Sequence, residues 1–599
     1  MTIGKGRAGL ALPFDRRSLL RSAGLGAGML ALPAWARTDS PGTPRDLPAL
    51  SGEDIHLRIA RQPIHIDGRH GHAIGINGTV PGPLIRLREG QNIRLHVENA
   101  LEEDSSIHWH GLILPFHMDG VPGISFPGIA PGASFTYEFP IVQAGTYWYH
   151  SHSGLQEQMG HYGPIVIDPA GGERIAFERE HVVVLSDYSF LHPHTIFRKL
   201  KQMGGYFNHQ RLTASDGEPM TAAERMEWGR MRMDPTDIAD VTGATYRYLV
   251  NGHGPGDNWT ALFRPGERVR LRIVNASAMT NFNVRIPGLA LSIVQADGQD
   301  VRPVEVDELQ IAVAETYDVI VQPAEDRAYT LAAESVDRSG MAVATLAPRP
   351  GMAAPVPPLR KRPLATMRDM GMGAMDHGAA GQGETAACAP EHAAMGHCAP
   401  GGEEHSPPSS HGAMDHSMRD FSLAPEVRRS PAVQSISPMP VDRTGDPGQG
   451  LEDAGHRVLT YRDLTAAERN PDVRGPEREL RIHLTGNMER YMWAFDGEKL
   501  SEVRDPIPFL EGERVRVTLV NDTMMAHPIH LHGHFFELVT GKGEFSPRKH
   551  TVNVQPGGTA SFDFTADALG DWAFHCHMLY HMHGGMMQVV TVRPRGEGA

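Results

Sequence analysis

The sequence predicts an all-β protein that is built from three related β-sandwich domains. Three segments start at a glycine and run through alternating apolar residues to an asparagine: "GQNIRLHVEN" from Gly90, "GERVRLRIVN" from Gly266 and "GERVRVTLVN" from Gly512. Such alternation is typical of a strand with one face on a core, and three copies imply three homologous domains. Apolar runs are short and turn residues are abundant, with 65 glycines and 46 prolines, as in β-sandwich proteins.

Length and charge limit the possible classes of protein. A chain of 599 residues is too long for one hydrophobic core, so several domains are expected. The formal net charge is −15, and Lys and Arg are scattered along the chain. We therefore expect no nucleic-acid partner and no anionic membrane patch.

The N-terminus, residues 1–36, has the features of an export signal. Arg16 and Arg17 precede a weakly apolar stretch rich in Gly and Ala, which ends at Ala34-Trp35-Ala36. An amphipathic helix or a membrane anchor is the alternative, but the stretch is too short to span a bilayer and too glycine-rich to pack well. We expect a twin-arginine signal that is cleaved after Ala36, and hence a periplasmic protein. No later segment is long and apolar enough to form a membrane span.

The repeats divide the rest of the chain into domains. We expect the first domain at 50–172, the second at 180–348 and the third at 475–595. The interval between the second and third repeats is much longer than the first interval, and Met, His, Gly, Ala and Pro dominate residues 351–420. The stretch 351–470 is therefore predicted to be a Met/His-rich insertion and linker.

Aligned on the repeats, the first and third domains share a histidine motif that the second lacks. Nine residues after the repeat asparagine, the first domain has His108 in "HWHG" and the third has His530 in "HLHG". The second domain has Val284 there, in the tripeptide Val284-Arg285-Ile286. We expect it to hold no catalytic metal and to act as a spacer.

A second alignment pairs two tripeptides. Gly145 and Gly570 each stand five residues before a histidine, so His150-Ser151-His152 corresponds to His575-Cys576-His577. Side chains alternate between the two faces of a strand, so His575 and His577 should point one way and Cys576 the other. One tripeptide can then serve two metal sites.

The side chains on the two faces predict different metal chemistry. On the cysteine side, one thiolate, two imidazoles and a weak thioether form a blue-copper donor set, namely Cys576, His527, His581 and Met586. On the other side, eight histidines in four His-x-His pairs fit a small metal cluster. A single pair is more often a surface or core pair, but four pairs at matching positions are hard to assign to packing. The pairs are His108 with His110, His150 with His152, His530 with His532, and His575 with His577.

Four motifs resemble the copper-binding motifs of the multicopper oxidases: "HWHG", "HSH", "HPIHLHGH" and "HCHMLYHMHGGM". The resemblance covers about 50–350 and 475–595 and implies three cupredoxin-like, Greek-key β-sandwich domains. It assigns type 1 copper to His527, Cys576, His581 and axial Met586, and type 2 copper to His108 and His530. It assigns the two type 3 coppers to His110, His150, His152, His532, His575 and His577, which makes four copper ions. The stretches "VAETYDVIV" and "GNMERYMWAFDG" are similar to periplasmic copper-resistance oxidases of the CopA type.

The resemblance implies a function. It predicts one-electron oxidation of a substrate, Cu(I) or a phenol, coupled to four-electron reduction of O2 to water, with periplasmic copper carriers as possible partners. The alternative is a copper-sequestering periplasmic protein with incidental laccase-like phenol oxidase activity. The complete ligand set favours the enzyme, because storage does not require a blue site joined to a cluster.

Two residues are candidates for catalytic roles besides the histidines. Cys576 would carry electrons toward His575 and His577. Asp119, eleven residues after His108, matches a carboxylate that supplies protons in relatives, but it is equally well explained as a turn former before Gly120. Some relatives have a carboxylate where this chain has Met582, so a proton route there is in doubt.

The insertion contains possible ligands for substrate copper. The unit Gly-Ala-Met-Asp-His occurs at 373–377 and again at 412–416. Thioethers prefer Cu(I), so the segment is predicted to bind additional Cu(I), although Gly/Ala/Pro-rich sequence is also typical of a disordered linker. Cys388 and Cys398 either form a disulfide or bind metal.

Overall fold

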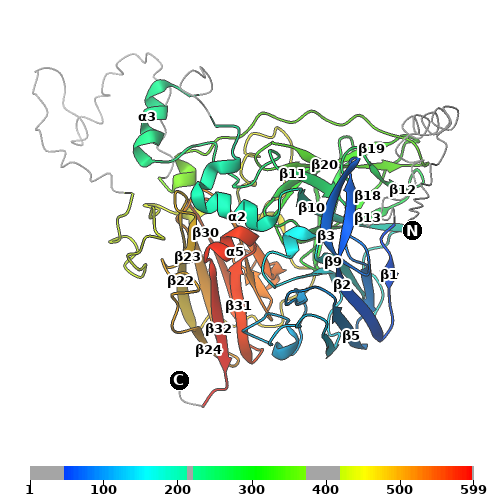
Figure 1. The fold of residues 1–599 in the computed structure, drawn as a ribbon, viewed down its shortest axis with the longest axis horizontal. Helices are drawn as coiled ribbons and strands as arrows, with labels where there is room; N and C mark the ends of the chain where they lie inside the picture. The colour runs from blue at the N-terminus through cyan, green and yellow to red at the C-terminus, as the bar shows by residue number, and fades with distance from the viewer. Residues whose placement is uncertain (1–45, 212–219, 373–417, 597–599) are drawn as a thin grey trace, which may run out of the picture.

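The computed structural model describes residues 46–211, 220–372 and 418–596. Its strands form six sheets, two in each of three successive stretches of the chain. In Figure 1 the first stretch (blue) and the last (orange to red) lie side by side, and the middle stretch (green) lies along both. The predicted export signal, Cys388, Cys398 and both Gly-Ala-Met-Asp-His units lie outside the described residues. Within the described ranges, none of the helices combines the length and the hydropathy of a membrane-spanning segment.

The first two sheets contain two of the predicted histidine motifs. One sheet has the strand order β3-β2-β5-β7 and the other has the order β1-β4-β9-β8-β6. The strands are β1 (Ala49–Leu50), β2 (Asp54–Ile66), β3 (Arg69–Ile76), β4 (Leu84–Arg88), β5 (Asn92–Asn99), β6 (His108–His110), β7 (Ser134–Pro140), β8 (Gly145–His150) and β9 (Tyr162–Asp168). Most of their buried apolar side chains form a separate core, whereas a few, such as Trp148 and Tyr162, pack in the larger core of the later stretches.

The second pair of sheets has the orders β11-β10-β13-β18-β15-β16 and β12-β20-β19-β14-β17. The strands are β10 (Arg179–Ser189), β11 (Tyr246–Val250), β12 (Trp259–Leu262), β13 (Val269–Asn275), β14 (Phe282–Arg285), β15 (Leu291–Ala296), β16 (Gln299–Val306), β17 (Glu308–Ile311), β18 (Thr316–Val321), β19 (Tyr329–Ser335) and β20 (Met341–Ala347). Helices α2 (Pro193–Gln202) and α3 (Ala222–Met231) lie in the connection from β10 to β11. The capping box of Thr221 and Glu224 fixes the start of α3.

The third pair has the orders β23-β22-β25-β30-β27-β28, with β21 added on β30, and β24-β32-β31-β26-β29. The strands are β21 (Val441–Asp442), β22 (Arg478–Asn487), β23 (Met492–Phe495), β24 (Ile507–Leu510), β25 (Arg514–Asn521), β26 (His527–Leu531), β27 (Phe536–Leu538), β28 (Arg548–Lys549), β29 (Thr551–Val554), β30 (Gly558–Thr565), β31 (Gly570–Cys576) and β32 (Met587–Arg593). A short helix, α5 (Leu579–Gly584), connects β31 to β32. One continuous apolar core joins the sheets of the second and third stretches.

The asparagine that ends each sequence repeat has a structural role. Asn99, Asn275 and Asn521 end β5, β13 and β25, and all three side chains are fully buried. Each side chain donates two hydrogen bonds to backbone carbonyls and accepts one from the N–H two residues later. The asparagine therefore fixes the turn after the strand. In the first and third stretches that turn leads to the strands β6 and β26, which carry His-x-His.

The described parts of 351–470 pack against the sheets. Leu459 N–H donates to Glu308 O at 2.9 Å, and Ser435 Oγ donates to Asp522 O at 2.6 Å. The two chain ends that flank residues 373–417 are held by one segment. Ile436 N–H donates to Met418 O at 2.7 Å, and Met439 N–H donates to Gly371 O at 2.8 Å.

Candidate metal centres

The four His-x-His pairs lie on or directly after two pairs of neighbouring strands. Strand β6 pairs with β8, which places His108 opposite His150. Strand β26 pairs with β31, which places His530 opposite His575. These strands are buried on both faces, so their imidazoles lie in the interior rather than at the surface.

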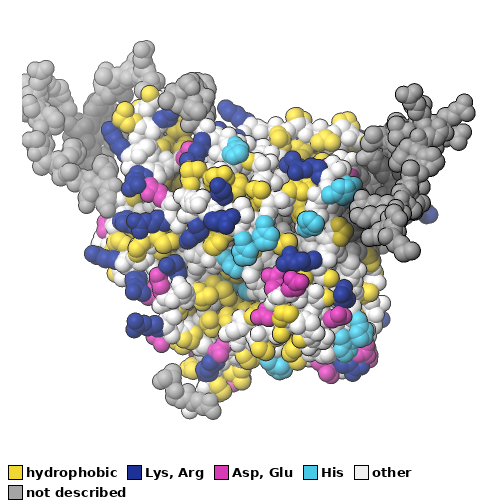
Figure 2. Space-filling model, viewed as in Figure 1, with side chains coloured by type: hydrophobic (Ala, Val, Ile, Leu, Met, Phe, Trp, Pro, Cys, Tyr) yellow, Lys and Arg dark blue, Asp and Glu magenta, His cyan; other side chains and the backbone are white. Residues whose placement is uncertain are grey.

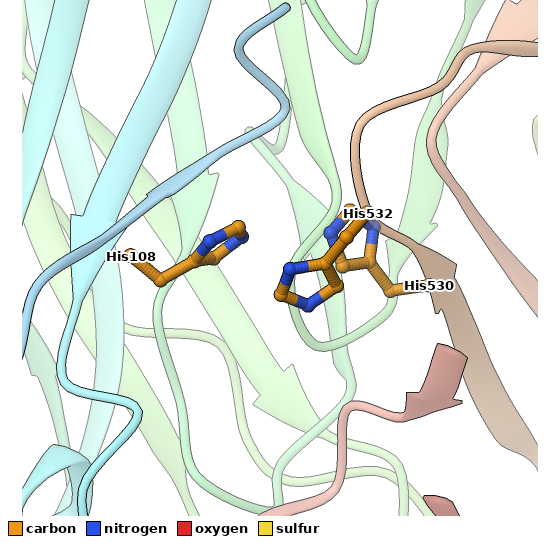
Figure 3. A group of neighbouring side chains, drawn as sticks. All are labelled: His108, His530 and His532. Carbon is orange, nitrogen blue, oxygen red and sulfur yellow. The ribbon is translucent and has the colours of Figure 1, made fainter. Parts of the chain in front are cut away.

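The structure brings all eight histidines together in one cluster. Their ring nitrogens form three sets in which the atoms lie within 4.8 Å of one another. Every set combines side chains from the first and third stretches of the chain, and Figure 3 shows one such set, with His108 facing His532 and His530. The sets are His108, His530 and His532; His110, His150 and His577; and His152, His532 and His575.

Hydrogen bonds orient the cluster rings. Four of the rings donate from Nδ1 to a backbone carbonyl, which leaves Nε2 directed elsewhere. These bonds run from His108 to Asp119 O (2.8 Å), from His150 to Ser151 O (3.0 Å), from His530 to His550 O (2.7 Å) and from His575 to Cys576 O (3.0 Å). Among the described residues, Nε2 of His108, His150 and His530 is buried without a hydrogen-bond partner. Buried polar atoms are nearly always paired, so these unpaired nitrogens fit a metal ion.

Burial sets the protonation state of the rings. It lowers the pKa of His575 to about 4 and holds the pKa of His110, His530 and His577 well below the ordinary value. A buried imidazolium is disfavoured because its charge is removed from water. These four histidines are therefore neutral, which is the form that binds metal.

The cysteine lies in a separate set on the other side of the strand. Cys576 Sγ is 3.6 Å from His527 Nδ1 and 3.7 Å from His581 Nδ1, and the two nitrogens are 3.1 Å apart. Here the rings are anchored through Nε2, to Thr523 Oγ1 at 2.8 Å and to Asp240 Oδ2 at 2.6 Å. The nitrogen left for a metal is thus Nδ1 at this site, whereas it is Nε2 in the four cluster rings that are anchored through Nδ1.

The fourth candidate donor, Met586, lies beside this set. Its side chain is fully buried, its carbonyl accepts from Cys576 N–H at 3.1 Å, and its own N–H donates to His581 O at 3.0 Å. Burial also raises the pKa of the Cys576 thiol. The thiol keeps its proton unless a cation takes its place, and one thiolate with two imidazoles and a thioether suits copper.

Asp119 forms the turn that the sequence suggested, and its carboxylate also contacts the histidine cluster. It caps a 3-10 turn (Phe116–Met118), and a Cβ at the following Gly120 (φ +80°) would collide with the backbone of Ile107. Its carboxylate oxygens lie 2.9 Å from His532 Nδ1 and 3.3 Å from His108 Nδ1. Asp119 therefore links a tight turn to two cluster histidines.

Three residues at these sites were not predicted. Glu157 Oε2 lies 2.9 Å from His150 Nδ1, and burial raises the pKa of this carboxyl well above its ordinary value. Asp240 contacts the His581 ring, although the two residues are far apart in the sequence. His550 lies next to His110 and His530. None of the three belongs to a repeated motif, and the only available hint was the proximity of Glu157 to His152 in the sequence.

The second stretch of the chain supplies no member of these sets within the described residues. Val284 and Ile286 are 1% exposed and belong to the apolar core. Asp240, however, comes from this stretch and contacts His581. Describing the second domain as a spacer alone is therefore incomplete.

Comparisons with known proteins agree with the geometry. Family models described as "Multicopper oxidase" match residues 58–171, 222–350 and 474–596. A "Copper resistance protein A homolog" of Pseudomonas syringae pv. tomato is 50% identical over 583 residues, covering 95% of this chain and 96% of that relative. A "Copper resistance protein A" of Escherichia coli is 46% identical, covering 97% of this chain and 100% of the relative.

Solved structures show the same fold at low sequence identity. Fet3p, described as "a Multicopper Oxidase that Functions in Iron Import", superposes with a TM-score of 0.61 at 18% identity, covering 91% of this chain and 90% of that one. A laccase from Botrytis aclada gives a TM-score of 0.60 at 20% identity, with 92% and 88% covered. The all-β, cupredoxin-like fold predicted from the sequence is confirmed. The chain belongs to the multicopper oxidase family, and it is an oxidoreductase with O2 as the electron acceptor.

Proposed function

We propose that this protein is a copper-resistance oxidase that converts Cu(I) to Cu(II) and uses the electrons to reduce O2 to water. The names of its relatives, copper resistance protein A, support the biological role. We choose Cu(I) as the substrate because a cluster of methionines lies beside the cysteine site.

The methionine cluster is a small group of side chains that is separate from the main core. Its members include nine methionines, three buried and six partly buried: Met220, Met370, Met524, Met231, Met233, Met367, Met372, Met418 and Met488. Methionine often fills irregular gaps in cores. So many thioethers in one small cluster beside a thiolate site favour a second use, because thioethers are soft ligands that prefer Cu(I).

The methionine cluster borders both histidines of the cysteine site. Met524 follows Thr523, whose hydroxyl contacts His527 Nε2 at 2.8 Å. Ile238, in the same cluster, stands two residues before Asp240, which contacts His581 Nε2 at 2.6 Å. Substrate Cu(I) held by these thioethers would lie close to the residues that accept its electron.

The donor sets support a partition of four copper ions. His527, Cys576, His581 and Met586 would hold type 1 copper, and His108 with His530 would hold type 2 copper. The two type 3 ions would be held by His110, His150 and His577, and by His152, His532 and His575. Copper at these sites would supply one-electron acceptance from substrate and four-electron reduction of O2.

The chain's own residues connect and supply the two sites. Cys576 is bonded through the backbone to His575 and His577. A continuous covalent path therefore connects the cysteine site to the cluster. Asp119, buried and in contact with His108 and His532, is proposed to hold and release protons for O2 reduction. Glu157 would hold a second proton beside His150.

The cellular setting is part of the proposal. Arg16, Arg17 and the Ala34-Trp35-Ala36 site support twin-arginine export to the periplasm. There, periplasmic copper carriers would be the partners that deliver Cu(I), and residues 373–417 would bind additional Cu(I). Figure 2 shows histidine side chains at the surface where α2 and α5 lie, and the exposed residues His192, His194 and His583 belong to these segments.

Oxygen uptake by the copper-loaded protein tests the proposed substrate. Met524→Leu and Met370→Leu conserve volume and remove a thioether. We expect uptake with Cu(I) to fall about tenfold as soft ligands are lost, while uptake with a phenol and the blue absorption stay unchanged. Met159→Leu, in the core of the first stretch, is the matched control.

Two outcomes would contradict the proposal. An unaltered Cu(I) rate in both cluster variants would show that the methionines only fill space. A parent protein that binds extra copper but does not turn over Cu(I) would identify the alternative, a sequestering protein with incidental phenol oxidase activity.

A further inference from the structure

A ninth histidine, His550, lies against the cluster although it belongs to none of the His-x-His pairs. It lies between β28 and β29 and is 1% exposed. Its ligand nitrogen forms a set with those of His110 and His530, all within 4.8 Å of one another. The ring centroid of His550 is 4.8 Å from that of His110 and 5.4 Å from that of His530.

One nitrogen of His550 is available to a ligand. Nδ1 lies 3.1 Å from Thr551 Oγ1. Nε2 is buried and has no hydrogen-bond partner anywhere in the described part of the chain, which is also true of His530 Nε2. A buried polar atom left unpaired is unfavourable by about 1–3 kcal/mol, and one metal ion bound by both nitrogens would pair the two of them.

The backbone of His550 fixes His530. The His550 carbonyl accepts the Nδ1–H of His530 at 2.7 Å. The N–H groups of His550 and Thr551 both donate to Asp297 Oδ2 at 3.2 Å. Movement of either imidazole is therefore coupled to the other through one short piece of backbone.

A buried ion-pair network from the second stretch of the chain holds this piece in place. Lys549 Nζ lies 3.0 Å from Asp297 Oδ2 and 3.1 Å from Glu315 Oε1, and the three side chains are at most 1% exposed. Losing one member of such a network is strongly destabilising, so the position of His550 is well determined.

The cluster also leaves room for the His550 ring. Gly111 directly follows His110 and has φ +81°, and a Cβ there would lie 2.6 Å from His550 Nε2 and Cδ2. Any other residue would need a disfavoured backbone conformation and would push the ring away. Glycine at this position therefore lets the imidazole reach the cluster.

From these contacts we infer that His550 is an additional copper donor, which gives Nε2 to the same copper ion as His530. The inference rests on the proposed function, since it assumes that the cluster holds copper. The set that His550 forms contains His530 and His110, so His550 adds one imidazole to the ion that His530 holds, which the partition above assigns as type 2. Neutral imidazole is a common ligand of copper.

A purely structural role makes a different prediction. If His550 only supports His530, the support comes from its backbone carbonyl, which any residue supplies. Replacing the ring would then leave the number of nitrogens bound to type 2 copper unchanged. The nitrogen count therefore distinguishes a donor from a support.

Pulsed EPR of the copper-loaded full chain can make this measurement. Wild type is expected to show three imidazole nitrogens coupled to type 2 copper, and His550→Gln is expected to lose one. His161→Gln is the matched control, because His161 is buried with both ring nitrogens unpaired among the described residues and belongs to none of the metal sets. The blue absorption from Cys576 should be the same in all three proteins.

The wild-type count keeps the inference falsifiable if His550→Gln does not fold. Two nitrogens in a blue wild-type protein, or an unchanged count in a folded His550→Gln protein, would overturn the role of His550 alone. A wild-type protein that binds no copper and has no blue absorption would instead overturn the proposed function.

Discussion

Two classes of histidine are distinguished by the ring nitrogen that the protein anchors. At the cluster, backbone carbonyls hold Nδ1 of His108 and His530, so Nε2 is free. At the cysteine site, Thr523 and Asp240 hold Nε2 of His527 and His581, so Nδ1 is free. Because the partner of one nitrogen fixes the tautomer, each site is ready for a metal before the metal arrives.

The thiol is the side chain that the blue colour depends on. Cys576→Ser should abolish the blue absorption, because a hydroxyl does not replace a thiolate as a soft copper ligand. The histidine cluster should keep its copper, since its donors point to the other side of the strand. Visible absorption together with metal analysis checks this, and a Cys576→Ser protein that is still blue would refute the assignment.

Asp240 should affect the reduction potential of the copper ion at the cysteine site. Burial raises the pKa of this carboxyl to about 7, and when ionised it places a negative charge next to His581. Asp240→Asn removes that charge, so the reduction potential of type 1 copper should rise, by on the order of 50 mV or about tenfold in the equilibrium constant. A redox titration of the blue band measures the shift. Asp237→Asn, a buried neighbour that does not contact His581, should leave the potential nearly unchanged.

Sequence reasoning identified the repeated candidate ligands, which the structure brings together, but not the residues that orient them. His108 and His530 stand out because two homologous domains show the same motif at the same distance from a repeat. Asp240 and His550 occur once, and they reach the site only through the tertiary fold. A lone Asp or His in a sequence carries no sign of which distant ring it will contact.

At the scale of elements, the strands were predictable and the helices were not. Alternation in "GERVRVTLVN" predicts β25, and the asparagine at its end marks the turn. The helix α5 has only six residues and carries His581. The motif that contains this helix was interpreted only as a set of metal ligands. A segment of six residues is also too short to show helical periodicity.

The turn that follows β23 should respond to pH. Burial raises the pKa of Asp496 from 3.8 to about 6, so the folded state binds a proton more tightly than the unfolded state. The stability from this group is fully present below pH 3.8 and is lost as the pH rises through about 6. Asp496→Asn keeps the acceptor for His483 N–H and should stabilise the protein at pH 7.5 by about 2 kcal/mol.

Thermal unfolding at two pH values tests the effect of Asp496. The melting temperature of Asp496→Asn should exceed that of the wild type by more at pH 7.5 than at pH 5. Asp563→Asn, a carboxylate paired with Arg516 on a neighbouring strand, should lower the melting temperature instead. An equal gain at both pH values would mean that protonation of Asp496 is not the cause.

Deleting the Met/His-rich segment separates copper delivery from copper storage. The deletion should cover 373–417 only, because Met367 and Met370 pack in the methionine cluster and Asp369 pairs with Arg443 at 2.7 Å. Cu(I) oxidation should fall because docking thioethers are lost, while phenol oxidation should persist or rise. Oxygen uptake with each substrate measures both. An unaltered Cu(I) rate would contradict delivery, and a loss of bound copper alone would indicate storage.

At the scale of the whole molecule, the apolar cores and the candidate metal-binding sets connect different stretches of the chain. The second and third stretches share one core, whereas most of the buried apolar side chains of the first stretch form a separate core. The histidine sets, by contrast, join the first stretch to the third. The fold class was predictable because it follows from local alternation. The division of the cores was not, because it depends on which domain faces pack together.

Copper removal should therefore loosen the first stretch selectively. A ligand that binds only the folded state stabilises it in proportion to the logarithm of its concentration over Kd. After chelation, calorimetry should show the melting temperature lowered by several degrees, with an early transition for the first stretch. Hydrogen exchange should rise first in β6 and β8, and copper should reverse both effects. A single unshifted transition would contradict this linkage.

Gly371 and Met418 are both anchored to residues 436–439, and this affects how strongly folding depends on the length of the segment between them. Both ends of the intervening segment are tied to the same short piece of backbone, so the gap to be bridged is fixed whatever lies between them. Loop-closure entropy grows only logarithmically, and doubling the number of residues costs about 0.6 kcal/mol. We therefore expect a change in the length of the segment 373–417 to have little effect on folding, so the number of copper ions proposed to bind there could change while the described core stays the same.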